Sequence, residues 1–360
     1  MNFCDHDCQS LADTLEQAGF ARVHAAKLLR NFYDNAASPD FSDLKCGTRL
    51  KAWLDRNMTW MQSHVASRAQ SADATVKLLV QFADGQAAEA VLMPGYRADR
   101  AAGCVSSQIG CAMGCDFCAS THGGLARDLT AGEIVEQFLH LKREAIQMGR
   151  RLSSLVFMGM GEPMHNLDNV IAAIRRIADP AMGALGWRQV TVSTVGIVPG
   201  IDRLADAGLN VHLALSLHAP DDVTRSRIVP ANRRYPVKEV MAAARRFAGK
   251  TGRVPTIEYC LLAGVNDSDE QARLLAECMA GFRAHVNLIP YNPIGLGLSG
   301  TAYRRPEMDR INRFVAALRA AGVVTHVRDT RGDDISAACG QLRHAVVKDP
   351  GGAVAPTSRK

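Results

Sequence analysis

The sequence predicts an α/β protein built on a largely parallel sheet that curves toward a barrel. Two observations support this fold class. Short strand-like runs rich in aliphatic residues recur at 103–109, 153–158, 189–194, 210–217, 256–262, 285–290 and 323–328. Amphipathic helical stretches separate most of them, at 130–148, 167–178, 200–207, 236–250, 268–280 and 304–321. Such alternation is typical of parallel sheets, whose functional residues collect at the carboxyl ends of the strands.

The N-terminal region, residues 9–75, reads as helical. Its apolar residues recur at helical spacing, namely Leu11, Leu15, Ala18, Ala21, Ala25, Leu28, Leu29 and Phe32. Gly19 and the segment 36–43 interrupt the run, and Ser42 with Asp43 can cap a second short helix. We therefore expect residues 1–74 to form a small helical accessory domain.

The next segment changes period. Residues 75–94 form two β-type runs joined by Asp84-Gly85, a strong hairpin signal. We expect a β-hairpin extension over 75–96 and the main α/β core over 97–345. The last residues, 346–360, are rich in Gly, Pro and small polar side chains and are expected to be a disordered tail.

Composition excludes several classes of protein. The 360 residues are 47% hydrophobic and 22% charged, so wholesale disorder is excluded. No apolar run is long enough for a membrane helix, and the N-terminus lacks a secretory signal, so we expect no membrane association and a cytoplasmic location. The ten cysteines are then not a disulfide framework. A net charge of +6, with recurrent arginine pairs, permits an RNA partner without requiring one.

The most specific motif is 111-CAMGCDFC-118. Cys111, Cys115 and Cys118 on one short loop can ligate three irons of a [4Fe–4S] cluster and leave the fourth iron open. A zinc site would need a fourth ligand, for which His122 is the natural candidate. A redox pair of Cys115 and Cys118 would leave Cys111 without a role. The N-terminal Cys4, His6 and Cys8 resemble a metal site but have no fourth ligand in reach.

The cysteine loop, with an aromatic residue before its last cysteine, resembles the radical S-adenosylmethionine (SAM) superfamily. Further motifs narrow the resemblance to the RlmN/Cfr family of RNA adenine methyltransferases: 103-GCVSSQIGCAMGCDFC-118, 157-FMGMGEP-163, 191-TVSTVGIVPGI-201, 214-ALSLHAP-220, 287-NLIPYNP-293 and 331-RGDDISAACGQL-342. They cover roughly residues 10–345 in family order. The resemblance implies a partial (β/α)6 radical-SAM barrel, a [4Fe–4S] cluster and two SAM molecules per turnover.

The family resemblance also gives roles to two further cysteines. A carbon of the adenine ring is poorly suited to displace the SAM methyl group directly, so the family uses a covalent detour. It implies that Cys339 becomes S-methylcysteine, that Cys104 resolves the RNA adduct through a transient disulfide with Cys339, and that Glu89 accepts the ring proton. The alternative for an isolated cysteine is a small buried hydrophobe. We assign no role to Cys4, Cys8, Cys46, Cys260 or Cys278.

The remaining SAM contacts follow from the same motifs. Glycine lets the backbone approach a ligand, and Glu162 can pair with the methionine ammonium. The positions that resemble the family's SAM-binding residues are Gly161, Glu162, Ser193, Ser216, Leu217, His218 and Asn292. Each lies near a predicted strand end, and His218 is expected to contribute its backbone.

The predicted function is therefore methylation of adenine carbon 2 in 23S rRNA, with tRNA as a further substrate. The enzyme would be a monomer served by an unidentified electron donor. Methylation at carbon 8 is the nearest alternative: 331-RGDD-334 favours carbon 2, whereas 124-GLARDL-129 leans the other way. An RNA-binding iron–sulfur sensor and a radical-SAM enzyme acting on a small molecule are alternatives of other classes.

Overall fold

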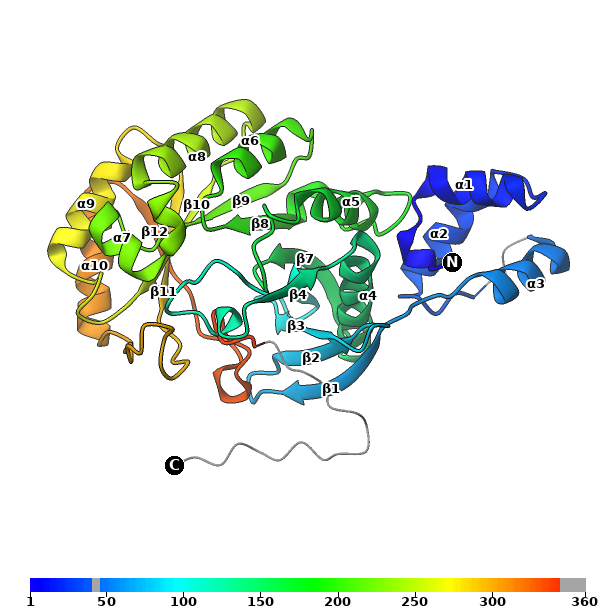
Figure 1. Ribbon diagram of the computed structural model, residues 1–360, viewed down its shortest axis with the longest axis horizontal. Coiled ribbons are helices and arrows are strands. Elements are labelled where there is room, and N and C mark those ends of the chain that lie inside the picture. The colour runs from blue at the N-terminus through cyan, green and yellow to red at the C-terminus, as the bar shows by residue number, and fades with distance from the viewer. Residues whose placement is uncertain (41–45, 344–360) are drawn as a thin grey trace.

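The computed structural model describes residues 1–40 and 46–343 of the chain (Figure 1). Its main sheet has ten strands in the order β1-β2-β3-β4-β7-β8-β9-β10-β11-β12. The sheet is open, with β1 and β12 at its edges. From β4 onward all neighbours are parallel, and the first part is antiparallel.

The parallel part confirms the predicted α/β barrel. Its strands are β4 (Arg100–Cys104), β7 (Arg151–Phe157), β8 (Val190–Thr194), β9 (His212–Ser216), β10 (Thr256–Leu261), β11 (His285–Pro290) and β12 (Val324–Val327). The helices between them are α4 (Ala131–Gln147), α5 (Leu167–Ala178), α6 (Val198–Asp206), α7 (Asp222–Ile228), α8 (Val237–Thr251), α9 (Asp269–Met279) and α10 (Met308–Ala320). They cover the outer face of the curved sheet (Figure 1). Only α7 among these helices has no counterpart in the sequence prediction.

The strand predicted over 103–109 is wrong as one element. β4 ends at Cys104, and β5 (Gln108–Gly110) leaves the main sheet to pair with β6 (Leu125–Asp128). The cause lies at Ser106, whose N–H donates to Gln137 Oε1 (2.9 Å) and whose hydroxyl donates to the Glu89 carbonyl (2.7 Å). These partners replace ladder hydrogen bonds, so the chain turns and presents the next residues at the carboxyl end of the barrel.

The predicted hairpin is confirmed and gains a third strand. β2 (Val76–Gln81) and β3 (Ala87–Pro94) pair antiparallel, and Gly85 takes the positive φ (+81°) that the tight turn needs. β1 (His64–Gln70) pairs with the outer side of β2. The helical prediction over 9–75 is therefore wrong at β1. Almost every side chain of this edge strand is exposed, so its sequence has no buried alternation to reveal it.

The N-terminal helices pack on the outside of the barrel. They are α1 (Cys8–Gln17), α2 (His24–Asp34) and α3 (Gly47–Asn57), preceded by a short 3₁₀ turn at Phe3–Asp5. The buried carboxylate of Glu136 on α4 accepts hydrogen bonds from the Asn2 side chain (2.8 Å) and the Ser63 amide (2.7 Å). The proposed cap at Ser42 and Asp43, and the tail 346–360, lie outside the described residues.

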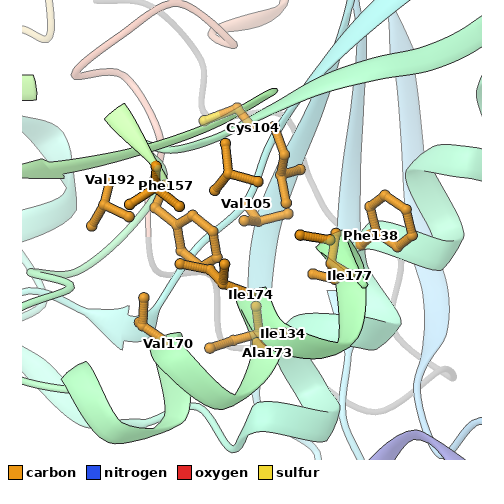
Figure 2. Close-up of a cluster of buried hydrophobic side chains, with 14 of the residues drawn as sticks. Cys104, Val105, Ile134, Phe138, Phe157, Val170, Ala173, Ile174, Ile177 and Val192 are labelled. Carbon is orange, nitrogen blue, oxygen red and sulfur yellow. The ribbon is translucent and has the colours of Figure 1, made fainter. Parts of the chain in front are cut away.

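The barrel core lies between the parallel strands and the covering helices. Figure 2 shows Phe157 and Val192 from the strands in one cluster with Ile174 of α5, and Phe138 of α4 beside Ile177 at its other side, all fully or almost fully buried. Cys104 lies at the edge of this cluster, with its sulfur directed away from the helices (Figure 2). Among the helices that the structure describes, none has the length and apolar composition to cross a membrane.

Candidate active site

A cavity opens at the carboxyl ends of the parallel strands. It is lined by the loop after β5, by residues in or just after β7, β8, β9, β10 and β11, and by residues that follow β12. The predicted site residues that line it are Cys111, Cys115, Cys118, Gly161, Glu162, Ser193, Ser216, His218 and Cys339. Chain segments more than 200 residues apart in sequence therefore meet at one place.

The cluster loop, residues 111–118, is anchored at its centre by Asp116. The Asp116 amide donates to the Ile228 carbonyl (3.0 Å), and its carboxylate accepts from the Ser299 amide (2.7 Å) and the Tyr303 hydroxyl (2.6 Å). Burial raises the pKa of this carboxyl, but these hydrogen bonds outweigh burial and hold the pKa below its usual value. The loop is thus fixed from both sides, which leaves its three thiols facing the cavity.

The three thiols fit an iron–sulfur cluster better than a single ion. Burial, and then the neighbouring Cys118 and Cys111, raises the pKa of Cys115 well above its usual value, and burial raises that of Cys111 to about 12. Three thiolates crowded together in an apolar cavity need a compensating cation, which cluster irons supply. Within residues 1–40 and 46–343, no three His, Cys, Asp or Glu side chains converge closely enough to hold one metal ion. His122 is exposed and away from the cavity, so the zinc interpretation lacks its fourth ligand.

Gly161 and Glu162 form a narrow turn after β7. Gly161 has φ +98°, and a Cβ there would lie 2.5 Å from Cβ of Gln108, so no other residue fits without displacing its neighbours. The Glu162 carboxylate accepts hydrogen bonds from the Met164 amide (3.0 Å) and the Val195 amide (2.9 Å). Burial raises its pKa to about 7. This buried carboxylate is available to an ammonium group near neutral pH.

Polar residues at the carboxyl ends of β8 and β9 face the same cavity. The hydroxyls of Ser193 and Ser216 lie 3.3 Å apart. His218 has a positive φ (+61°), and its Nδ1 accepts the Cys260 amide (3.0 Å). Burial lowers the pKa of His218 to about 3, so the ring is neutral and serves as a packing group. Leu217 is fully buried outside the cavity lining.

A second cavity adjoins the first and contains Cys104. Met158, Ile289, Arg328 and Cys339 line both cavities. Burial, and then the nearby Cys339, raises the pKa of the Cys104 thiol to about 12. Cys339 therefore lies between the cavity of the cluster loop and the cavity of Cys104. A residue that reacts with groups in both cavities would have to lie here.

The Cys339 loop, residues 329–343, is held by hydrogen bonds to residues that are distant from it in the sequence. The Asn292 amide donates to the Cys339 carbonyl (3.2 Å), and the Ala119 amide donates to the Gly340 carbonyl (2.7 Å). Gln341 donates to the Pro293 carbonyl (3.2 Å). Asn292 lines the second cavity rather than the first, so the structure places it beside Cys339.

Glu89 is buried in β3 and lines neither cavity. Its carboxylate forms an ion pair with Lys77 (2.9 Å) and accepts the Arg343 amide (2.8 Å). Val91 and Met93, which share its strand face, do line the cavity of Cys104. Glu89 thus lies on the face of the hairpin that is turned toward the second cavity, but it is not among the residues that line that cavity.

Three charged residues of the site escaped the sequence reasoning. Arg225 is fully buried and donates to the Leu217 (2.9 Å) and Val195 (2.5 Å) carbonyls, which fixes two cavity segments. Glu258 lines the first cavity; its Oε1 accepts from Asn287 (3.1 Å), and Arg328 lies 3.8 Å from Oε2. A charged residue inside the apolar strand TIEYCL was a signal for Glu258 that could have been used.

Comparison with known proteins gives concordant results. The model of the radical SAM superfamily matches residues 105–276. A probable dual-specificity RNA methyltransferase RlmN 1 from Opitutus terrae is 54% identical over 92% of this chain and 94% of its own length. The RlmN relative from Symbiobacterium thermophilum is 45% identical over 93% and 89%. The crystal structure of a radical SAM methyltransferase from Sphaerobacter thermophilus superposes with a TM-score of 0.88 at 44% identity, covering 95% of this chain and 99% of that one.

Proposed function

The chain belongs to the RlmN family of radical-SAM RNA methyltransferases, and we propose that it methylates carbon 2 of an adenosine in 23S rRNA and in tRNA. As a member of this family it is a SAM-dependent enzyme with a [4Fe–4S] cluster. The observation that supports the proposed reaction most strongly is the position of Cys339, which lines both the cavity of the cluster loop and the cavity of Cys104.

The cluster-side cavity supplies the binding groups. Cys111, Cys115 and Cys118 would hold the cluster, and the turn at Gly161 and Glu162 would receive the SAM methionine. When bound, the cluster and SAM supply a 5′-deoxyadenosyl radical for one step and a methyl group for another. The hydroxyls of Ser193 and Ser216 are placed to accept or donate hydrogen bonds to the nucleoside.

The proposed chemistry uses two SAM molecules per turnover at Cys339. Its thiolate takes the methyl group of the first SAM: a new S–C bond forms as the sulfonium–methyl bond breaks. A hydrogen atom would then pass from that methyl group to the 5′-deoxyadenosyl radical, and the methylene carbon would bond to the adenine ring carbon. One electron would return from the adduct to the cluster, which is left oxidised by one electron when SAM is cleaved, and Glu89 would accept the ring proton.

Cys104 completes the turnover. Its thiolate attacks the Cys339 sulfur, so an S–S bond forms while the bond from sulfur to the methylene carbon breaks. The methylene group takes up a proton and becomes the methyl group of the product. Both cysteines line the second cavity, where the proposed disulfide would form once per turnover and then be reduced.

Carbon 2 is preferred over carbon 8 because the curated relatives described above carry the RlmN name and because this chain has 331-RGDD-334. The test is mass spectrometry of nucleosides from RNA treated with the reduced, cluster-loaded enzyme. Synthetic 2-methyladenosine and 8-methyladenosine serve as standards. We expect 2-methyladenosine alone; a product that comigrates with the 8-methyl isomer contradicts the proposal.

We also propose that the N-terminal unit contacts the RNA backbone, as an accessory domain to the barrel. Its helices carry exposed basic side chains such as Lys27 and Lys51. Deletion of residues 1–57 should weaken binding of a structured 23S rRNA fragment while the iron content is retained. Unchanged binding by the truncated protein excludes this role.

A further inference from the structure

A surface groove continues outward from the cavity of Cys104. It runs over the turn between β3 and β4 and along the end of β7. Met93, Val156, Arg328 and Arg331 line both the groove and the cavity, so the two are continuous. Anything that enters the cavity from this side lies along the groove.

The groove is strongly basic. Arg97, Arg100, Arg328 and Arg331 line it, against the single carboxylate of Asp329. In the part of the chain that the structure describes, the guanidinium groups of Arg97 and Arg331 make no hydrogen bond or ion pair, and Nε of Arg100 is buried without a partner. Arginines that the protein leaves unpaired along one path are suited to the phosphates of a nucleic acid.

Tyr96 stands at the edge of this groove with 96% of its surface exposed. The other strongly exposed large hydrophobic residues within 1–40 and 46–343 are aliphatic, so this exposed aromatic ring is exceptional in the molecule. An aromatic ring that packs against no other side chain leaves its apolar surface in water and adds nothing to the stability of the fold. Beside a row of arginines it provides a face on which an unpaired base can stack.

We propose that this groove binds the single-stranded RNA on one side of the target adenosine, with a flanking base stacked on Tyr96 and flanking phosphates on Arg97 and Arg331. The inference rests on the proposed function, because it takes the adenine to lie in the cavity shared by Cys104 and Cys339. Duplex RNA is excluded from this mode, since its bases are stacked on each other and present no free face.

The stacking contact is tested with full-length, cluster-loaded enzyme and a fluorescein-labelled, unstructured RNA of about a dozen nucleotides with one central adenosine. Fluorescence anisotropy gives the dissociation constant. Tyr96→Ala should raise it about 5- to 150-fold, the range for loss of one base–aromatic stack, whereas Tyr96→Phe keeps the ring and should stay within about twofold. The same RNA annealed to its complement should bind more weakly than the single strand.

The phosphate contacts are tested by salt dependence. Each phosphate contact on single-stranded RNA contributes about 0.7 to the slope of log affinity against log salt concentration. Arg97→Gln and Arg331→Gln should each reduce that slope by about 0.7. Arg313→Gln, on the exposed outer face of α10, is the matched control and should leave the slope unchanged.

Two outcomes contradict the proposal that the groove binds single-stranded RNA. One is a dissociation constant for Tyr96→Ala equal to that of the wild type, and the other is equal binding of duplex and single-stranded RNA. Assaying RNA methylation with the same preparations separates this inference from the proposed function. If the wild type methylates RNA and Tyr96→Ala binds RNA as tightly as the wild type, the proposed function is supported and the proposed RNA-binding role of the groove is wrong. If the wild type methylates no RNA, the proposed function fails, and the binding data still judge the groove by itself.

Discussion

The cluster loop and the Cys339 loop both bring thiols to the mouth of the barrel, but they are built differently. The cluster loop is compact, with three cysteines within eight residues and one central anchor at Asp116. The Cys339 loop has one cysteine, and its position depends on hydrogen bonds from Asn292, Ala119 and Gln341. We therefore interpret the first loop as a pre-formed cradle for the proposed cluster and the second as the proposed methyl carrier, held between two cavities.

Cys118→Ala should give the largest effect, because the cradle is expected to hold the cluster only when all three thiols are present. Two remaining thiols leave a second iron without a protein ligand, so we expect the iron content to fall below about a tenth of the wild-type value. SAM cleavage and RNA methylation should then be lost together. Iron analysis and the visible absorbance of the reconstituted protein provide the measurement. Cys278→Ala, at a half-buried position on α9, is the control and should retain the cluster.

Substitution in the Cys339 loop should separate chemistry from cofactor binding. Cys339→Ala should keep its cluster, yet RNA methylation should fall at least about a thousandfold, because no other nucleophile can replace the thiolate. Cys104→Ala should retain the first half of the reaction and accumulate RNA covalently attached through Cys339. Denaturing gels with labelled RNA detect that adduct. A methylating Cys339→Ala enzyme would favour an RNA-binding sensor or a different chemistry.

Glu162 lies on the cluster side and makes that side sensitive to pH. Its pKa is about 7 in the folded protein against 4.5 for the free group, so the folded state binds more protons between these values. The corresponding stability is fully present below about pH 4.5 and is lost as pH rises through about 7. At roughly 1.4 kcal/mol per pKa unit, the loss amounts to about 3 kcal/mol.

Urea unfolding of metal-free protein at several pH values tests this assignment. The wild type should lose more unfolding free energy than Glu162→Gln does as pH rises from about 5 to 8, because glutamine has no proton to release. The comparison between the two proteins cancels the opposing contribution of buried histidines such as His140, whose pKa burial lowers to about 4. Parallel curves for the two proteins would show that Glu162 is already ionised at pH 5.

The difference between the loops also explains what the sequence could reveal. The spacing of Cys111, Cys115 and Cys118 within one short loop predicts an iron–sulfur cluster by itself. The alternation of strands and helices predicts the barrel. Nothing near Cys339 in the sequence says that it faces Cys104, which lies 235 residues earlier; that role came from the resemblance to a family. Glu258 had a signal in the sequence, as a charged residue inside an apolar strand, but Arg225 had none, because a buried charge depends on partners that only the folded chain brings together.

The smallest effect should come from loosening the Cys339 loop without touching its thiol. Gln341 is 6% exposed; its side chain donates to the Pro293 carbonyl and to Asp333 (2.8 Å), and it accepts the Ala338 amide (3.1 Å). Gln341→Ala removes all three contacts, worth about 0.5–1.5 kcal/mol each in net terms and about 1.5–3 kcal/mol for the one to the Asp333 carboxylate, and leaves the cradle intact.

We therefore expect Gln341→Ala to keep its full iron content and to methylate RNA about tenfold more slowly, a change of about 1.4 kcal/mol. The decrease should fall on kcat rather than on the KM for SAM, because the proposed SAM contacts lie on the cluster side. Gln189→Ala, at an exposed position before β8, is the matched control. If Gln341→Ala instead loses iron, the two loops form one cooperative unit, and the division between cradle and carrier is wrong.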